Sequence, residues 1–282
     1  VINSKSYNFF NYCVFDGGGS DLINGVHLSG MLSMYNSDVN ISNSVFKNAS
    51  KNNGDDALNV KNAFAHIEKS HFIANHKDAI DLDFVDKESE VLGSFFKDNG
   101  NDSIDISGSN NIFLRENIII NSGDKGISAG EESYVVVENN KIKNNSYGVV
   151  SKDSSIVNII ESSINNNNIG VAAYNKKMIF GGGEVYIHSS NLDSNTRVFG
   201  VENIAKEDSG RYKMKRFKSF IGSDSNKHNS TGEVYKFIIA SPSKRATSKK
   251  KLLKAMLEDK LNDYQFKYAI FSDNYTYLEN NE

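Results

Sequence analysis

One short phrase recurs along this chain at a nearly constant interval, and this recurrence constrains the fold more than any other feature. In each strong copy an acidic residue precedes a small residue and a short apolar run, at residues 56–60, 78–82 and 102–106. These copies start 22 and then 24 residues apart, and weaker copies start at Lys125, Tyr147 and Ile169. A period in the low twenties with short β-type runs predicts a solenoid of stacked coils.

A second pattern places Asn at a fixed distance behind an apolar residue. Asn suits a bend between two short strands, because it tolerates the left-handed backbone region and its side chain can bond to the backbone. We therefore expect these amides to form a ladder on stacked coils. The residues that follow the pattern are Asn48, Asn75, Asn99, Asn121, Asn145, Asn167 and Asn195.

Alternation within the repeated strand predicts which side chains face the core. Ile80, Leu82 and Phe84 alternate with Asp81 and Asp83, so one set should face inward and the other should face water. We expect Asp81 and its counterpart on the next coil, Asp105, to be exposed. The side chains that we expect to be buried are Ile80, Leu82, Phe84, Ile104, Ile106, Ile127, Val149 and Val171.

The Asn bends and the repeated acidic phrases give the chain a family resemblance from about residue 1 to residue 195. It resembles the right-handed parallel β-helix proteins of the pectate-lyase-like superfamily. The resemblance implies an all-β, right-handed parallel β-helix and does not fix the activity. A leucine-rich repeat is the rival solenoid, but its Leu-rich consensus is missing and the β-branched content favours strands.

The last third of the chain differs in charge and pattern. Residues 1–200, the expected β-helix, carry 16 Lys and Arg against 24 Asp and Glu, whereas residues 201–282 carry 16 against 11. Strands are expected near residues 211–218, 234–240 and 266–272, and a helix over residues 248–264. We expect a small α+β cap over the open end of the solenoid, or a basic appendage that docks on an acidic partner.

Several classes of partner and location can be considered from sequence alone. The basic residues come with no recognisable module for nucleic-acid recognition, and no apolar run approaches the roughly 18 residues of a membrane span. The single cysteine, Cys13, excludes an internal disulfide framework. Because the chain opens on a strand-like Val1-Ile2 without an initiator Met or signal peptide, we expect that earlier coils or a cap were removed. We expect an extracellular or cell-surface location.

Acidic side chains should stack on the outward face of the repeated strand. One column would contain Asp56, Asp78, Asp102 and Lys125, and a second Asn59, Asp81, Asp105 and Ser128. Carboxylates on coils about 4.8 Å apart repel one another, so they need a cation, a basic neighbour or a proton. Ca²⁺ is the simplest cation for oxygen ligands. The expected Ca²⁺ ligands are Asp78, Asp81, Asp83, Asp102 and Asp105.

Enzyme families on this fold narrow the chemistry. Gly54-Asp55-Asp56 looks like the paired aspartates of polygalacturonases, but none of the six His residues has Gly on both sides, and the coils beyond Asp105 contain no Arg-x-Lys phrase as those hydrolases do. The Asp-Pro-His phrase of mannuronan C5-epimerases is missing too. Polysaccharide lyases of this fold often need only acidic Ca²⁺ ligands and a Lys or Arg base. The resemblance thus implies Lys125 or Arg115 as the base, and as substrate-binding residues Asp55, Asp56, Asn59 and Lys152.

Two functions follow from these patterns. The first is an extracytoplasmic protein that binds or modifies a polysaccharide, with Ca²⁺-assisted cleavage of a uronate polymer as the favoured reaction. The alternative is a non-catalytic structural or adhesive solenoid, such as a surface or tail-fibre element. In that case the stacked acidic residues only satisfy backbone N–H groups at the bends.

Overall fold

Short strands repeat along the chain, as the sequence pattern predicts. The computed structural model describes residues 1–50, 55–85, 87–177 and 179–200, and the backbone of five later strands. The described residues contain no helix, and the helix expected over residues 248–264 lies outside them. Strands are found close to three other expected positions, as β26, β28 and β29. The later strands are β26 (Lys213–Lys218), β27 (Lys227–Thr231), β28 (Lys236–Ala240), β29 (Lys267–Ile270) and β30 (Thr276–Glu279).

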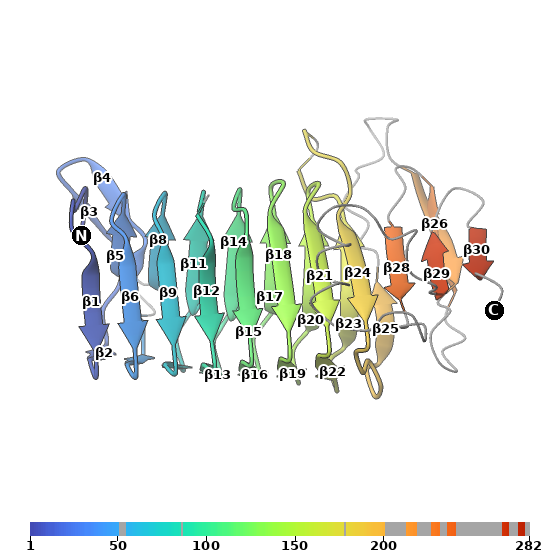
Figure 1. Cartoon of the computed structure of the whole chain (residues 1–282), viewed down its shortest axis with the longest axis horizontal. Helices are drawn as coiled ribbons and strands as arrows, with labels where there is room; N and C mark the ends of the chain where they lie inside the picture. The colour runs from blue at the N-terminus through green and yellow to red at the C-terminus, as the bar shows by residue number, and fades with distance from the viewer. Residues whose placement is uncertain are drawn as a thin grey trace.

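The strands build a solenoid in which each coil contributes to three long parallel sheets (Figure 1). Sheet 1 has eight strands: β5 (Gly30–Tyr35), β8 (Asp56–Lys61), β11 (Ile80–Asp83), β14 (Ile104–Ser107), β17 (Lys125–Gly130), β20 (Tyr147–Lys152), β23 (Ile169–Tyr174) and β25 (Arg197–Gly200). Seven of these, from β8 to β25, lie between residues 56 and 200, so the predicted solenoid of stacked coils is confirmed.

The other two long sheets complete each coil. Sheet 2 contains β1 (Asn8–Asn11), β6 (Val39–Ser42), β9 (Ala65–Glu68), β12 (Ser89–Leu92), β15 (Ile112–Arg115), β18 (Tyr134–Glu138), β21 (Ile156–Ile160) and β24 (Glu184–His188), and continues into β28, β29 and β30. Sheet 3 contains β2 (Val14–Asp16), β7 (Val45–Lys47), β10 (His71–Ile73), β13 (Phe95–Lys97), β16 (Ile118–Ile120), β19 (Lys141–Lys143) and β22 (Ser163–Asn165). A hairpin of β3 (Asp21–Ile23) and β4 (Val26–Leu28) lies near the N-terminus.

The core consists of inward side chains that stack on like side chains of the next coil. The rings of Phe46 and Phe72 are parallel with centroids 4.8 Å apart, and those of Phe72 and Phe96 are 5.0 Å apart. Such columns remove large apolar surfaces from water at every coil. The expected burial is confirmed for Ile80, Leu82, Ile104, Ile106, Ile127, Val149 and Val171.

The predicted burial of Phe84 is wrong. Strand β11 ends at Asp83, and Phe84 occupies the following corner with a φ of 52° and half of its surface exposed. The same corner is occupied by Asn36, Asn62 and Gly108 on neighbouring coils, all with positive φ. The strand alternation stops at this corner, so it cannot fix the direction of the Phe84 side chain.

The Asn ladder exists, with a register that differs from the prediction in two coils. The backbone N–H of Asn75 donates to Oδ1 of Asn99, and that of Asn145 donates to Oδ1 of Asn167. Asn48 and Asn121 do not occupy the ladder position. Strand pairing aligns Phe46 with Phe72 and Ile119 with Ile142, so the ladder position falls one residue later, on Ala49 and Ser122.

Two further corners carry the same device with other residues. At one corner the N–H of Ser70 donates to Oγ of Ser94, whose own N–H donates to Oδ1 of Asn117. At the other, the N–H of Ser109 donates to Oγ of Ser133. At each of these corners a side chain of one coil accepts a hydrogen bond from a buried N–H of the coil before it. The buried donors at the bends therefore find their acceptors inside the solenoid.

Candidate functional site

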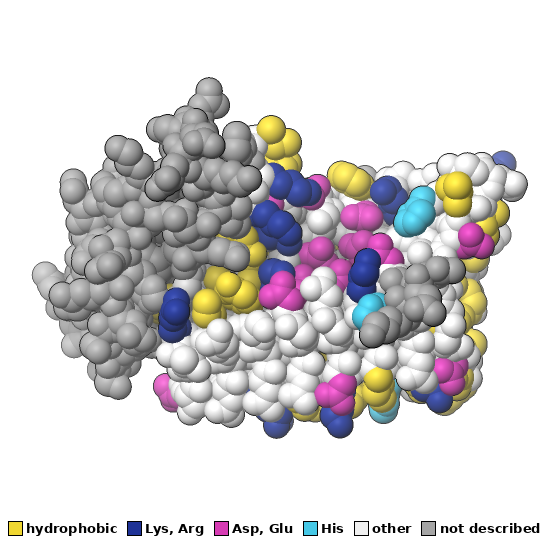
Figure 2. Space-filling model, turned by 180° about the vertical axis from the view of Figure 1, so that it is seen from behind, with side chains coloured by type: hydrophobic (Ala, Val, Ile, Leu, Met, Phe, Trp, Pro, Cys, Tyr) yellow, Lys and Arg dark blue, Asp and Glu magenta, His cyan; other side chains and the backbone are white. Residues whose placement is uncertain are grey.

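The two acidic columns expected from the repeat lie on the outward face of sheet 1. Strand pairing aligns Asp81 with Asn59 on one side and with Asp105 on the other, and aligns Asp105 with Ser128. The same registers carry the first column from Asp56 through Asp78 and Asp102 to Lys125. Figure 2 shows acidic side chains gathered on one face of the coils, with Lys and Arg side chains beside them. We call this surface the acidic face and define it by Asp56, Asn59, Asp78, Asp81, Asp83, Asp102, Asp105, Lys125, Ser128 and Lys152.

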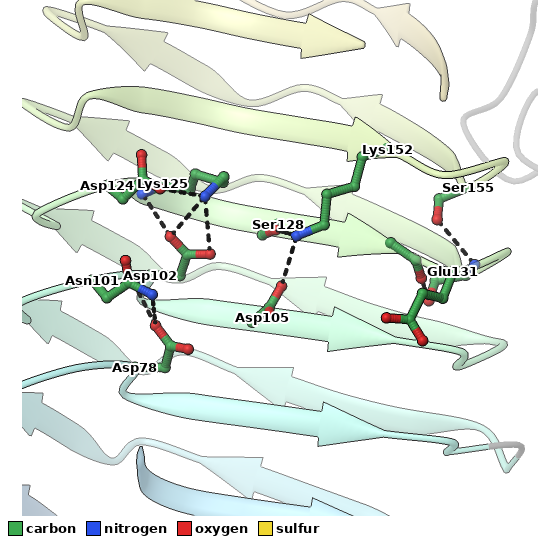
Figure 3. Close-up of polar contacts among 12 residues, drawn as sticks. Asp78, Asn101, Asp102, Asp105, Asp124, Lys125, Ser128, Glu131, Lys152 and Ser155 are labelled. Carbon is green, nitrogen blue, oxygen red and sulfur yellow. Dashed lines mark hydrogen bonds and ion pairs between the residues drawn. The ribbon is translucent and has the colours of Figure 1, made fainter. Parts of the chain in front are cut away.

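In the first column, two carboxylates bond to the backbone of the next coil. Oδ1 of Asp78 accepts from the N–H of Asp102 and from Nδ2 of Asn101, both at 2.7 Å (Figure 3). Oδ1 of Asp102 accepts from the N–H of Lys125 at 2.9 Å. These contacts, in which a carboxylate satisfies a backbone N–H at a bend, are those that the non-catalytic alternative requires. They engage one oxygen of each carboxyl group and leave the other available for different contacts.

Lys125 is a buried cation held between carboxylates. Its Nζ lies 3.4 Å from both carboxylate oxygens of Asp102 and also contacts the carboxylate of Asp124. Burial alone would lower the pKa of Lys125, but attraction to Asp102 and Asp124 outweighs burial and raises that pKa. Lys125 therefore stays an ammonium at neutral pH, which does not favour the expected role as a proton-abstracting base.

The second column contains acceptors that no described residue satisfies. Nδ2 of Asn59 donates to Oδ2 of Asp81 at 2.9 Å, while Oδ1 of the fully buried Asn59 has no hydrogen-bond partner among the described residues. Oδ1 of Asp105 is likewise a buried acceptor without such a partner, although Nζ of Lys152 lies 3.5 Å away as an ion pair. Lys152 donates to Oγ of Ser128 at 2.8 Å. A buried acceptor without a donor is costly, and the ion pair with Lys152 offsets part of that cost for Asp105.

Burial and mutual repulsion make the acidic face retain protons. The pKa of Asp56 is raised to about 7 and that of Asp78 to about 8, first by burial and then by repulsion from neighbouring carboxylates. Burial also raises the pKa of Asp102 to about 6, although Lys125 acts in the opposite direction. The pKa of Asp81 is raised well above its ordinary value, again first by burial, and burial also raises that of Asp83. Several of these carboxyl groups therefore hold a proton near neutral pH.

The expected substrate-binding residues differ in how much of them a ligand could touch. Asp55 is partly exposed and forms an ion pair of 2.8 Å with Lys77 at the edge of sheet 1. Asp56, Asn59 and Lys152 are buried, so in this structure they act by positioning their neighbours. The acidic face reaches solvent through other carboxyl groups, those of Asp78, Asp81, Asp83 and Asp105.

Arg115 does not belong to this site. It lies on β15 in sheet 2, where its guanidinium contacts Oε1 of Glu90 at 2.6 Å and Oε2 of Glu138 at 3.0 Å. The same guanidinium lies 4.3 Å from the ring centroid of Phe113. Because Lys125 lies on sheet 1, the structure separates the two expected bases, and Arg115 is the centre of a separate ion-pair network.

The site residues that the sequence did not predict are mainly neighbours in sequence of predicted residues. Asp124 follows no repeated phrase, but as the acidic neighbour of Lys125 in sequence it could have been suspected. Asn101, next to Asp102, offers the same kind of signal. The part of the chain that the structure describes contains no group of three or more His, Cys, Asp or Glu side chains that could hold a metal ion.

Comparison with known proteins gives the family. A search of curated proteins finds no match to this chain. A family model described as the right handed beta helix region matches residues 56–205, which is more than half of the 282 residues. Among the described residues, no helix has the length and apolar character that a membrane crossing requires. The pattern of stacked coils and the family match agree, and the chain belongs to the right-handed β-helix family.

Proposed function

We propose that this protein binds a polysaccharide along the acidic face of sheet 1 and modifies it by acid–base chemistry. The observation that carries the proposal is the stack of partly exposed carboxyl groups on neighbouring strands of sheet 1, where burial and mutual repulsion raise the pKa values of Asp78 and Asp81. Carboxyl groups with raised pKa values are suited to proton transfer at physiological pH. They also offer both donors and acceptors to sugar hydroxyl groups. An extracellular or cell-surface location belongs to the same proposal.

Asp81 and Asp105 are the best candidates for the acid–base pair. They lie opposite one another on β11 and β14, at the spacing of neighbouring strands, and both reach the surface. Two carboxyl groups at such a distance tend to share one proton. Burial raises the pKa of Asp81, which favours it as the proton donor, and Oδ1 of Asp105 lies 3.5 Å from Nζ of Lys152.

Ca²⁺ is a second way to neutralise the same face, and it would suit an anionic polymer of uronates. The Oδ1 atoms of Asn59 and Asp105, which accept no hydrogen bond from a described residue, are hard oxygen acceptors of the kind that Ca²⁺ prefers. Together with Asp81 and Asp83 they would hold the ion after those side chains turn toward it, and bound Ca²⁺ would neutralise substrate carboxylates. Of the other expected ligands, Asp78 and Asp102 already use one oxygen each for backbone N–H groups.

A non-catalytic solenoid is the second candidate function. The observation that favours it is the pair of backbone contacts made by Asp78 and Asp102, which would stabilise the bends whether or not the face binds anything. The two functions differ in what they predict for Asp81 and Asp105. Neither of these side chains bonds to a backbone N–H among the described residues, and their contacts are instead with the side chains of Asn59 and Lys152.

The test is an activity screen with matched variants. The protein is incubated with polygalacturonate, alginate and a soluble β-glucan, with Ca²⁺ or with a chelator, and both near-ultraviolet absorbance and new reducing ends are measured. Absorbing products indicate elimination, and reducing ends without absorbance indicate hydrolysis. We expect Asp81→Asn and Asp105→Asn to reduce turnover by roughly 10²-fold or more, while Asp98→Asn, on an exposed corner away from sheet 1, leaves turnover unchanged.

The outcomes separate the two functions. If the wild-type protein releases no product and binds none of the polymers, the acidic face is structural and the proposal fails. If it binds a polymer without releasing product, the chain is a polysaccharide-binding module and the acid–base role of Asp81 and Asp105 is wrong.

A further inference from the structure

Phe84 is an unusual residue at the rim of the acidic face. It occupies the corner after β11 with a φ of 52°, where the coils on either side have Asn62 and Gly108. A left-handed backbone costs a bulky residue more than it costs Asn or Gly. The ring recovers little of that cost through burial, since half of the residue remains exposed. Positive φ angles recur at the corners of this solenoid, and it is the exposed aromatic ring, in place of Asn or Gly, that sets Phe84 apart from this corner on the neighbouring coils.

The surroundings of the ring hold it in a fixed place. A Cβ atom added to Gly108 would lie only 2.7 Å from Cδ1 of Phe84, so the ring rests against the backbone of the next coil where a side chain is missing. On the other side, Nζ of Lys61 lies 5.5 Å from the centroid of the Phe84 ring and 5.9 Å from that of Tyr35. The ring is thus supported on the side of Gly108, and half of the residue remains exposed beside Nζ of Lys61.

The position of this ring connects it to the acidic face. Phe84 follows Asp83 directly, and Nζ of Lys61 lies 3.8 Å from Oδ2 of Asp83. Asp81 lies on the same strand, two residues before Asp83. A polymer lying along β11 would therefore contact these carboxyl groups and the Phe84 ring one after another.

We propose that Phe84, supported by Gly108, is a stacking platform for one sugar ring of the polysaccharide, an inference that rests on the proposed function. The exposed ring of Phe84 suits a pyranose that presents C–H bonds on one side, because that side of the sugar is apolar and slightly positive, whereas the face of an aromatic ring is slightly negative. Lys61 beside the ring supplies N–H donors for the oxygen atoms of the same sugar. The platform is a binding element and takes no part in proton transfer.

The test compares substitutions at Phe84 with one at another exposed aromatic residue. Phe84→Asn introduces the residue that already occupies this corner on neighbouring coils, and Phe84→Trp keeps an aromatic face. The control is Phe9→Asn, since Phe9 is 71% exposed on β1 of sheet 2. Dissociation constants are measured for polygalacturonate, a soluble β-glucan and polyglutamate, which is an anionic polymer without sugar rings.

We expect Phe84→Asn to weaken binding of the preferred polysaccharide by roughly three- to tenfold and to leave the thermal midpoint equal or higher. Phe84→Trp and Phe9→Asn should bind like the wild type, and polyglutamate should not distinguish Phe84→Asn from wild type. Equal polysaccharide affinities for wild type and Phe84→Asn would overturn the platform while leaving the proposed function intact. A wild type that binds neither polysaccharide would overturn both.

Discussion

Replacing Asp78 by Asn would measure how much the ionisation of this carboxyl group in the acidic face destabilises the folded chain. The amide keeps an Oδ1 acceptor for Nδ2 of Asn101 and for the N–H of Asp102, so the two 2.7 Å hydrogen bonds can persist. What the substitution removes is the titrating group. Any change in stability that depends on pH therefore reports the ionisation of Asp78.

The sign and ceiling of the effect follow from the pKa of Asp78. The folded chain holds this proton up to about pH 8, whereas an ordinary carboxyl group in the unfolded chain releases it near its pKa of 3.8. Unfolding thus releases a proton between these pH values, and this group makes wild-type stability fall as the pH rises through that window. Each tenfold difference in proton affinity is worth about 1.4 kcal/mol, so the ceiling above pH 8 is about 6 kcal/mol.

The expected effect is smaller than that ceiling. The half-buried carboxylate of Asp78 can turn toward water and so lose part of the burial cost that raises its pKa. We expect Asp78→Asn to be more stable than wild type by about 2 kcal/mol at pH 8.5 and equal to it near pH 4. At about 2–4 °C per kcal/mol, the thermal midpoint should rise by roughly 4–8 °C at pH 8.5.

The assay is thermal unfolding followed by circular dichroism at several pH values from 4 to 9, with wild type, Asp78→Asn and Asp98→Asn measured side by side. Asp98 lies on an exposed corner, where its carboxylate accepts from Nδ2 of Asn121. Its replacement should not change the pH dependence. Parallel curves for wild type and Asp78→Asn over the whole range would refute the reasoning, because Asp78 would then ionise as easily in the folded chain as in the unfolded one.

Two further predictions concern the charges around Asp78. Millimolar Ca²⁺ should raise the thermal midpoint more at pH 8 than at pH 6, because protons and Ca²⁺ compete for the same oxygens. The double variant Asp81→Asn and Asp105→Asn should lose most of that rise. An unchanged wild-type midpoint at both pH values would exclude the calcium site. Lys125→Met should destabilise the fold by about 3 kcal/mol at pH 8, because it leaves the buried Asp102 without its counter-charge. The measurement is urea unfolding, with Lys143→Met, at an exposed position on β19, as the control. Equal free energies of unfolding for the two variants would contradict the prediction.

The acidic columns could be predicted from sequence because two periodicities fix them together. The repeat interval places Asp56, Asp78 and Asp102 on successive coils, and the two-residue alternation of a strand places Asp81 and Asp105 on its outward side. Both rules depend only on backbone geometry, and the strand pairing agrees with them. The same rules could not foresee the corner at Phe84, where the strand ends and its alternation no longer applies.

Other errors come from features that the sequence pattern leaves ambiguous. On two coils the ladder position is occupied by Ala49 and Ser122, so the pattern of an apolar residue and an Asn three positions later fits only the register one residue earlier, at Asn48 and Asn121. Arg115 lies ten positions before Lys125, which is nearly half of a coil, and this distance puts it on another sheet. Predicting which residues share a face therefore requires the position around the coil as well as the coil number.

The hydrogen bonds at the corners give the solenoid a direction of dependence. At three corners, the side chain that satisfies a buried N–H comes from the following coil, as Asn99 does for Asn75, Ser94 for Ser70 and Ser133 for Ser109. At these three corners, cutting the stack from its C-terminal side would leave buried N–H donors without acceptors, whereas cutting from the N-terminal side would free side-chain acceptors that can turn to water. The N–H and C=O groups of the strands lose partners in either case. Each coil is thus completed by its successor, and shortened versions of this protein should tolerate loss of early coils better than loss of late ones.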